Sequence, residues 1–379
     1  MPKRVLLPAL VLVLALAGAL PAAAGTDRAT GADRYVVVLK AGVDANTVAA
    51  LHARRYGAAP DAVYQYALKG YAAVIPNDRV AALRLDENVA YVEADGDVEA
   101  TAQTLPWGID RIDADVSSTL AGNGSGAVSN VNVYVIDTGV DASHPDLNVV
   151  NHVNFAGGKN TDCHGHGTHV AGTVAARDNA SDVVGVAPGA PITGVKVLGC
   201  SGHGSNSSVI GGIDWVTANA VKPAVANMSL GGGVSNAIDD AVLNSAASGV
   251  FYAVAAGNDG ADACTHSPAR AGAGTNNGIA TIAATDSSNL EASWSNYGSC
   301  VDLWAPGVSI LSTRRGGGTT TMSGTSMATP HTTGAAALYL SSHSASPSSV
   351  ESALKADTTT PGTRSKNGTA IKLLYAGRY

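Results

Sequence analysis

The stretch Val131-Asn-Val-Tyr-Val-Ile-Asp137-Thr-Gly139 is a run of apolar and β-branched residues that ends in an aspartate and a glycine. Runs of this kind are typical of strands that are buried on both faces. Similar runs of apolar and β-branched residues occur at Ile192–Leu198, Val225–Ser229, Val250–Ala255 and Ile279–Ala284. Helical stretches are predicted to alternate with these strands, at Gly167–Ala176, Ser207–Asn219, Ala237–Ser248 and Thr325–Ser341. The pattern predicts an α/β fold, with a mainly parallel sheet that helices cover on both faces.

Reactive residue types stand where predicted strands or loops meet helices. Asp137 ends the first run, and His166 lies in the glycine-rich segment Cys163-His-Gly-His-Gly-Thr-His169. Ser326 lies in Ser323-Gly-Thr-Ser-Met-Ala-Thr-Pro330, just before an alanine-rich helix. A serine hydroxyl needs an adjacent base, which a buried acid holds in turn, and Asp, His, Ser is a known chain order for such a triad. We therefore predict Asp137, His166 and Ser326 as a catalytic triad.

Acyl transfer also needs hydrogen-bond donors for the developing oxyanion. Asn258 follows the strand Val250–Ala255 and is the predicted side-chain donor, with the backbone amide of Ser326 as the second donor. Two exposed strand edges are predicted to pair with an extended peptide, one at Asn227–Gly232 and one at Gly202–Ser205. The chemistry predicted is therefore that of a serine hydrolase acting on peptides.

Other interpretations of these motifs stay open. Taken alone, Ser326 is more typical of a helix N-cap than of a nucleophile. The segment Cys163–His169 carries zinc-ligand residue types, although the HExxH signature is absent. Gly202-x-Gly204 follows a strand and precedes a helix, but the third glycine of a dinucleotide fingerprint is missing. A lipase of the α/β-hydrolase class would need Gly-x-Ser-x-Gly and the order Ser, Asp, His, and neither is found. A catalytically silent peptide-binding protein is the remaining alternative.

A smaller α+β module precedes the main domain. Strands are predicted at Tyr35–Lys40, Gly70–Ile75 and Val89–Glu93, and helices at Asp44–Tyr56 and Asp78–Asp86. The polar stretch from 95 to 106 lacks periodicity, which predicts an exposed linker and a cleavage seam.

The N-terminus predicts export. Lys3-Arg4, the apolar run Val5–Leu20 and the Ala22-Ala-Ala24 segment have the three parts of a secretory signal peptide, cut after Ala24, and the alternative is a retained membrane anchor. The chain has 379 residues, 45% hydrophobic and 14% charged, with a formal charge of -7. This composition supports a large core and argues against a nucleic-acid partner.

The four cysteines are expected to form disulfides because the protein is exported. Three pairings are possible. We favour Cys163 with Cys200 and Cys264 with Cys300, since each would connect one functional loop to the next, but spacing alone does not decide this, and metal binding competes.

The motifs VIDTG, HGTHVAG, NMSLGG, AAGN and GTSMATP occur in order between 135 and 330. With them, the chain from about Ala100 to Tyr379 resembles the subtilases, secreted subtilisin-like serine proteases, and in particular the proteinase K and aqualysin group. Residues Tyr35–Glu93 are similar to the inhibitory propeptide of that family. The resemblance implies a signal peptide at 1–24, a propeptide domain at 25–99 and a subtilisin-like peptidase domain at 100–379, with processing between 99 and 103.

The resemblance also implies roles for individual residues. It repeats the triad of Asp137, His166 and Ser326 with Asn258 as oxyanion donor, and it supports the two favoured disulfides. Structural calcium is implied, with Asp302, Asp110 and Asp113 at positions that look like ligands; Thr363 departs from the pattern, because it stands where proteinase K has a ligating carboxylate. The residues expected to bind substrate are Gly202, Gly204, Ser229, Leu230, Gly231, Gly232, Ala255, Ala256 and Gly257.

These expectations combine into one functional hypothesis. The protein is predicted to be a secreted, monomeric serine endopeptidase, made as a self-processing zymogen, that cleaves peptide bonds through an acyl-enzyme with a broad preference for apolar or aromatic residues. Its own propeptide is the expected inhibitor and folding aid. No organic cofactor, nucleic acid or stable membrane anchor is expected.

Overall fold

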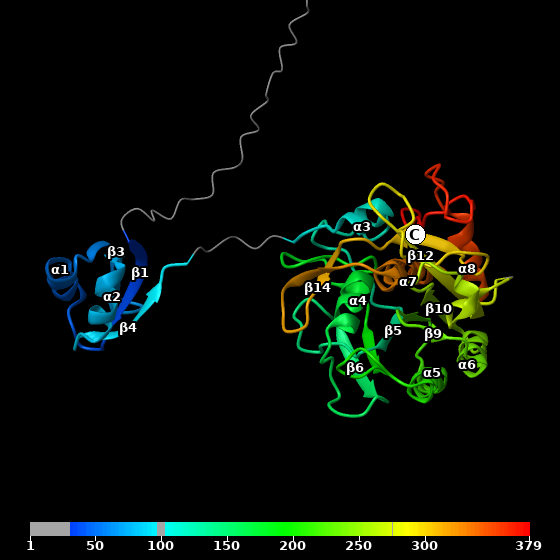
Figure 1. Cartoon of the computed structure of the whole chain (residues 1–379), viewed down its shortest axis with the longest axis horizontal. Helices are drawn as coiled ribbons and strands as arrows, with labels where there is room; N and C mark the ends of the chain where they lie inside the picture. The colour runs from blue at the N-terminus through cyan, green and yellow to red at the C-terminus, as the bar shows by residue number, and fades with distance from the viewer. Residues whose placement is uncertain (1–30, 97–102, 275) are drawn as a thin grey trace, which may run out of the picture. The chain divides into compact units, whose positions relative to one another are not determined.

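The computed structural model describes residues 31–96, 103–274 and 276–379. These residues divide into two compact units, one within Met1–Ala100 and one within Thr101–Tyr379 (Figure 1). The predicted signal peptide, and the predicted processing segment up to residue 102, lie outside the described residues.

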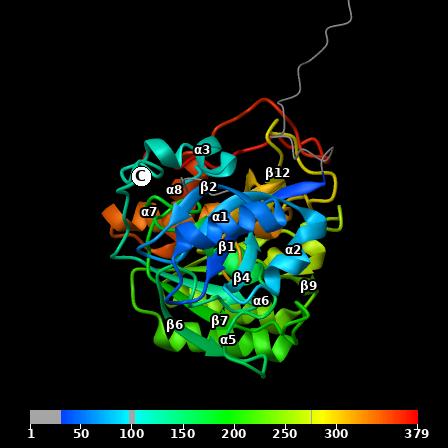
Figure 2. The ribbon, with the colours of Figure 1, turned by 90° about the vertical axis from the view of Figure 1, so that its left-hand side faces the viewer.

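The first unit is a four-stranded antiparallel sheet with two helices. Its sheet order is β2-β3-β1-β4. Figure 2 shows both helices in front of the strands, on one face of the sheet, where they enclose a small core that includes Val37, Tyr71 and Leu83. The α+β prediction is confirmed. The elements are β1 (Ala32–Leu39), α1 (Ala45–Tyr56), β2 (Ala59–Tyr64), β3 (Gly70–Pro76), α2 (Asn77–Arg84) and β4 (Val89–Ala94).

The second unit is built on a parallel sheet of seven strands in the order β13-β12-β10-β8-β5-β7-β6. Every neighbouring pair in this sheet is parallel. All carboxyl ends of the strands therefore lie along one edge of the sheet. The strands are β5 (Asn132–Asp137), β6 (Val149–Asn154), β7 (Ile192–Lys196), β8 (Ala224–Met228), β10 (Val250–Ala255), β12 (Ile279–Thr285) and β13 (Leu303–Pro306).

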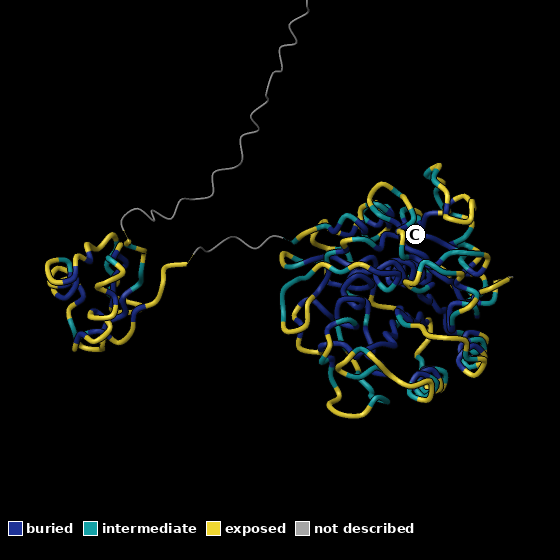
Figure 3. The backbone as a smooth tube through the Cα atoms, viewed as in Figure 1, coloured by how far each residue is buried: buried dark blue, intermediate teal, exposed yellow. Residues whose placement is uncertain are grey.

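Helices cover both faces of this sheet, as predicted. In β5, Val133 and Val135 belong to one hydrophobic core, whereas Tyr134 and Ile136 belong to the other. The first core includes side chains from α4 (His166–Ala175), α7 (Thr325–Ser342) and α8 (Pro347–Ala356), and the second includes side chains from α5 (Asn206–Asn219) and α6 (Asn236–Ala247). Figure 1 shows α5 and α6 on the side of the sheet opposite α7 and α8, and Figure 3 shows that the strands between them are buried.

Short elements complete the second unit. Two-stranded pairs are formed by β9 with β11 and by β14 with β15. No helix among the described residues is long and apolar enough to cross a membrane. The remaining elements are α3 (Trp107–Arg111), η1 (Ala114–Val116), β9 (Gly232–Gly233), η2 (Ala263–Thr265), β11 (His266–Ser267), η3 (Ala269–Gly272), β14 (Ile310–Thr313) and β15 (Thr319–Met322).

Candidate active site

The candidate acid and base meet where β5 ends and α4 begins. Asp137 is the last residue of β5 and is fully buried, and His166 is the first residue of α4. Oδ1 of Asp137 lies 2.7 Å from Nδ1 of His166 and also accepts a hydrogen bond from the backbone N–H of Thr138. The close approach of helix to strand requires Gly167, because a side chain there would collide with the carbonyl of Gly139.

The environment of His166 suits it to act as a base. Burial alone would lower the pKa of the imidazole, but the negative charge and hydrogen bond of Asp137 outweigh burial and raise the pKa of His166 above its ordinary value. A carboxylate at Nδ1 also requires the proton on that nitrogen. Nε2 is therefore left with the lone pair that can accept a proton.

Asp162 organises the loop that leads into α4, and the sequence analysis missed it. Its Oδ1 accepts hydrogen bonds from the backbone N–H groups of His164 (2.9 Å) and Gly165 (2.8 Å) and from Oγ1 of Thr138 (3.0 Å). Its Oδ2 accepts from the backbone N–H of Thr168 at 3.0 Å. These bonds attach the His166 loop to the end of β5. An aspartate shortly before a predicted helix start is the only sequence signal that could have identified it.

Ser326 lies in the first turn of α7 and is hydrogen-bonded to the residue that follows β8. Its Oγ donates to the carbonyl oxygen of Ser229 at 3.1 Å, and Oγ of Ser229 donates to the carbonyl oxygen of Ser326 at 2.8 Å. Among the described residues, the Ser326 hydroxyl thus bonds to Ser229 rather than to His166. This reciprocal pair holds the start of α7 against the sheet.

Asn258 has one end of its amide fixed and the other end available. Its Oδ1 accepts hydrogen bonds from the backbone N–H of Thr325 (2.9 Å) and from Oγ1 of Thr325 (3.0 Å). Fixing the oxygen end leaves the Nδ2 donor for another partner. Asn258 and Ser326 line the same cavity, of about 400 Å³.

Two adjoining cavities contain all the predicted substrate-binding residues. The first holds Ser326 and Asn258, and the second, of about 390 Å³, holds His166. Both are lined by Leu230–Gly233, the segment that follows β8. The first cavity also includes Ala255, Ala256, Gly257, Asp259 and His266, and the second includes Gly202, Gly204, Ser229, His164 and His203.

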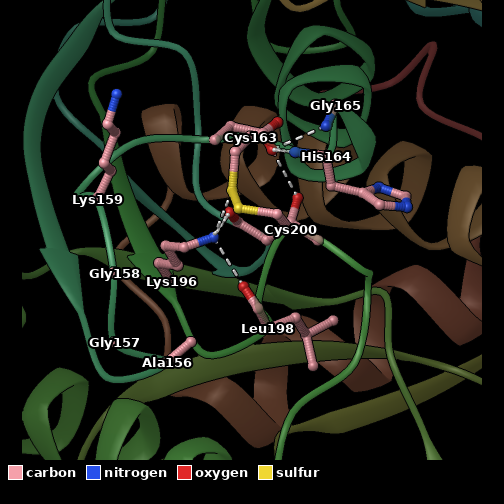
Figure 4. The surroundings of a disulfide bond; sticks show 12 residues. Ala156, Gly157, Gly158, Lys159, Cys163, His164, Gly165, Lys196, Leu198 and Cys200 are labelled. Atoms are coloured by element: carbon pink, nitrogen blue, oxygen red, sulfur yellow. Dashed lines mark hydrogen bonds between the residues drawn. A yellow bond between two sulfur atoms is a disulfide. The ribbon is translucent and has the colours of Figure 1, made fainter.

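The cysteines form both favoured disulfides, Cys163–Cys200 and Cys264–Cys300. The first joins the His166 loop to the segment that leads into the second cavity. Beside it lies Lys196, whose side chain is almost fully buried and whose Nζ donates to the carbonyl oxygens of Thr138 (2.6 Å) and Leu198 (2.8 Å) (Figure 4). Burial lowers the pKa of Lys196. Sequence reasoning missed this lysine, because only the pairing of β5 with β7 places it opposite Asp137.

The described residues contain no group of three or more histidine, cysteine or acidic side chains that could hold a metal ion. Asp302, Asp110 and Asp113, the residues predicted to ligate calcium, are thus not members of such a group. Oδ1 of Asp302 instead lies 2.8 Å from Nζ of Lys355. The zinc alternative is not supported either, because Nε2 of the buried His169 bonds to the carbonyl oxygen of Ile310.

Comparisons with known proteins agree with this architecture. Residues 128–371 match the model of the subtilase family, and residues 34–101 match peptidase inhibitor I9. The chain is 50% identical over 312 residues to the extracellular serine proteinase of Thermus sp. (strain Rt41A), which covers 79% of this chain and 73% of that protein. It is 42% identical over 322 residues to proteinase R of Parengyodontium album, covering 82% of this chain and 79% of that protein.

A solved structure of a cold adapted subtilisin-like serine proteinase aligns with a TM-score of 0.62 and 44% identity, covering 71% of this chain and 97% of that chain. One family assignment agrees with the parallel sheet, with the matched family model and with the relatives. The chain is a serine protease that belongs to the subtilase family and carries an I9 inhibitor segment before its peptidase unit.

Proposed function

We propose that this protein is a secreted endopeptidase in which Asp137, His166 and Ser326 form the triad. The 2.7 Å contact between Asp137 and His166, at the same end of the sheet as Ser326, is the observation that carries the proposal. When substrate binds, Oγ of Ser326 leaves the Ser229 carbonyl and attacks the scissile carbonyl carbon, while Nε2 of His166 takes its proton. The imidazolium then returns that proton to the leaving amine, and water hydrolyses the acyl-enzyme by the same route.

Asn258 is proposed to stabilise the oxyanion of the tetrahedral intermediate. Its Nδ2 is the free end of an amide whose oxygen is held by Thr325. The second donor is the backbone N–H of Ser326. Such preorganised donors stabilise the charge that develops in the transition state more than they stabilise the substrate.

The cavity beside Ser326 is proposed to bind the side chain that precedes the cleaved bond. Its walls include the Leu230 side chain, the glycine backbone that follows it, and Ala255 and Ala256. Small residues leave room for a large side chain, and the apolar surface favours an apolar or aromatic one. The glycine segments 202–204 and 231–233 are proposed to pair with the backbone of a protein or peptide substrate.

The first unit is proposed to be an inhibitory propeptide that assists folding and is removed by self-cleavage between 99 and 103. The I9 match over residues 34–101 supports this proposal. Residues 1–24 are proposed to direct secretion, in keeping with the relative from Thermus sp. that is named an extracellular proteinase. The proposed domains are therefore 1–24, 25–99 and 100–379, and the mature protein is proposed to be a monomer.

The test is expression of the full chain with Ser326→Ala. We expect an unprocessed chain that does not hydrolyse casein, whereas Ser323→Ala, three residues earlier, should process and hydrolyse normally. Self-processing and casein hydrolysis by Ser326→Ala at the wild-type rate would refute the proposal. Labelling with a fluorophosphonate separates the peptidase from a silent peptide-binding protein, because only an activated Ser326 should react.

A further inference from the structure

Lys355 lies between two carboxylates that are almost completely buried, and it does not line either of the active-site cavities. Its Nζ is 2.8 Å from Oδ1 of Asp302 and 3.0 Å from Oε1 of Glu351, which precedes it by one turn in α8. The side chain of Asp302 is 8% exposed and that of Glu351 is 0% exposed, so water screens neither charge well. One ammonium group therefore neutralises two carboxylates that would otherwise repel each other.

The other oxygens of these carboxylates are also occupied. Oδ2 of Asp302 accepts a hydrogen bond from the backbone N–H of Thr281 at 2.9 Å. Oε2 of Glu351 accepts from the N–H groups of Asn277 (2.7 Å) and Gly278 (2.8 Å). The network thus joins α8, the start of β12 and the residue before β13. Each of the four carboxylate oxygens thus has a donor from the chain itself.

A calcium ion at this position would compete with Lys355. Calcium is bound by several carboxylate and carbonyl oxygens, and an ammonium in the same space would repel it. The carboxylate that the family resemblance implies as a calcium ligand is therefore already paired with a cation of the chain itself. We propose that Lys355 replaces a metal ion at Asp302, so that this part of the protein is held together without calcium.

The network also supports one wall of the candidate active site. Oγ1 of Thr281 donates to the carbonyl oxygen of Ala269 at 2.7 Å, and Ala269 begins η3, two residues after the end of β11. His266 and Ser267 of β11 line the cavity that contains Ser326. The ammonium of Lys355 thus contributes to fixing a wall of that cavity, through Asp302 and Thr281.

The test compares thermal unfolding in excess EDTA and in excess calcium chloride, in the Ser326→Ala chain so that proteolysis does not affect the result. Lys355→Met removes the charge and keeps the length of the side chain. We expect the midpoint of this variant in EDTA to fall by on the order of 10 °C, because two buried carboxylates lose their partner. Calcium should restore a large part of the loss, and the double variant Lys355→Met/Asp302→Asn should lose this restoration.

A second measurement does not depend on the folding of the lysine variant. Isothermal titration with calcium should give the same stoichiometry for the Ser326→Ala chain and for its Asp302→Asn variant. The proposal is overturned if Asp302→Asn removes a calcium site from the chain that retains Lys355. It is also overturned if folded Lys355→Met gains no more stability from calcium than the parent chain does. Both readouts measure binding or unfolding, so they are independent of whether Ser326 is the nucleophile.

Discussion

At the scale of single residues, the contact between Asp137 and His166 predicts how activity depends on pH. The imidazole must be neutral to accept a proton, and Asp137 raises its pKa above the ordinary value of 6.5. We therefore expect kcat/KM to be maximal at alkaline pH and to fall as the pH drops through this raised pKa. Asp137→Asn should move the acidic limb of the profile to lower pH and reduce kcat by about 10⁴-fold. An acidic limb that does not move would argue against this pairing.

Asn258 offers a second test at this scale. Asn258→Ala should lower kcat by about 10²- to 10³-fold with little change in KM, because the lost donor acts mainly in the transition state. Thr325→Val keeps the side-chain shape but removes the hydroxyl that holds the amide oxygen, so we expect a smaller loss of kcat. Steady-state kinetics on a peptide anilide measure both effects. A change confined to KM would contradict the oxyanion assignment.

Asp259 adds a negative charge to the cavity that contains Ser326. Its side chain is 66% exposed and lies 3.2 Å from Nε2 of His266. An exposed charge contributes modestly to binding. We therefore expect Asp259→Asn to reduce kcat/KM several-fold for a peptide with lysine before the cleaved bond. The value of kcat/KM for the matching peptide with phenylalanine at that position should stay nearly unchanged. Asp214→Asn, on the exposed face of α5, is the matched control and should alter neither value. Equal effects on both substrates would exclude a role for this charge in selectivity.

At the scale of helices and strands, the buried parallel strands were predictable because their apolar residues run without interruption. Among the elements that were not predicted are β2, β6, β13 and α8. β2 and β6 carry exposed or polar residues at the edges of their sheets, and β13 is an edge strand of only four residues. Their identity depends on pairing with a neighbouring strand, which the local sequence does not specify.

In the candidate site, too, some residues could be predicted from the sequence and others could not. Asp137, His166, Asn258 and Ser326 were predictable, because each lies in a short motif beside a predicted strand or helix. Lys196 and Lys355 were not, because their partners are distant in sequence and are brought to them by strand pairing or helix packing. The fold class and the reactive residues were thus accessible from local pattern, whereas the charges that support them were not.

The two disulfides are predicted to contribute equally to stability but differently to activity. They close loops of similar length, with sequence separations of 37 and 36 residues, so the chain-entropy model gives each about 4 kcal/mol. Cys163→Ser/Cys200→Ser and Cys264→Ser/Cys300→Ser should therefore lower the unfolding midpoint by similar amounts. Only the first pair should also reduce kcat/KM markedly, because Cys163 lies in the loop that positions His166. Equal kinetic losses in the two variants would contradict this distinction.

At the scale of the whole molecule, the stability of the first unit is predicted to decrease in acid. In the first unit, His52 is fully buried between Tyr71 and Asp86, and burial lowers its pKa below the ordinary value of 6.5. The unfolded unit therefore binds the proton more tightly than the folded unit does. Its stability should be complete above pH 6.5 and should decrease below it, by up to about 1.4 kcal/mol per pH unit.

Hydrogen exchange on the unprocessed Ser326→Ala chain can follow each unit separately. Amides of β1 and β3 should lose protection below pH 6.5, after correction for the intrinsic pH dependence of exchange. His52→Gln should flatten this dependence. Protection of the first unit that stays constant down to pH 5 would show that the imidazole does not control its stability.

The helix that carries Ser326 has one further consequence. α7 contains 18 residues, most of them buried, and Ser326 is in its first turn. The peptide dipoles of such a helix sum to roughly half a positive charge at its start. An oxyanion that forms at that end of the helix therefore experiences an attractive field from the backbone itself, in addition to the hydrogen bonds of the two donors.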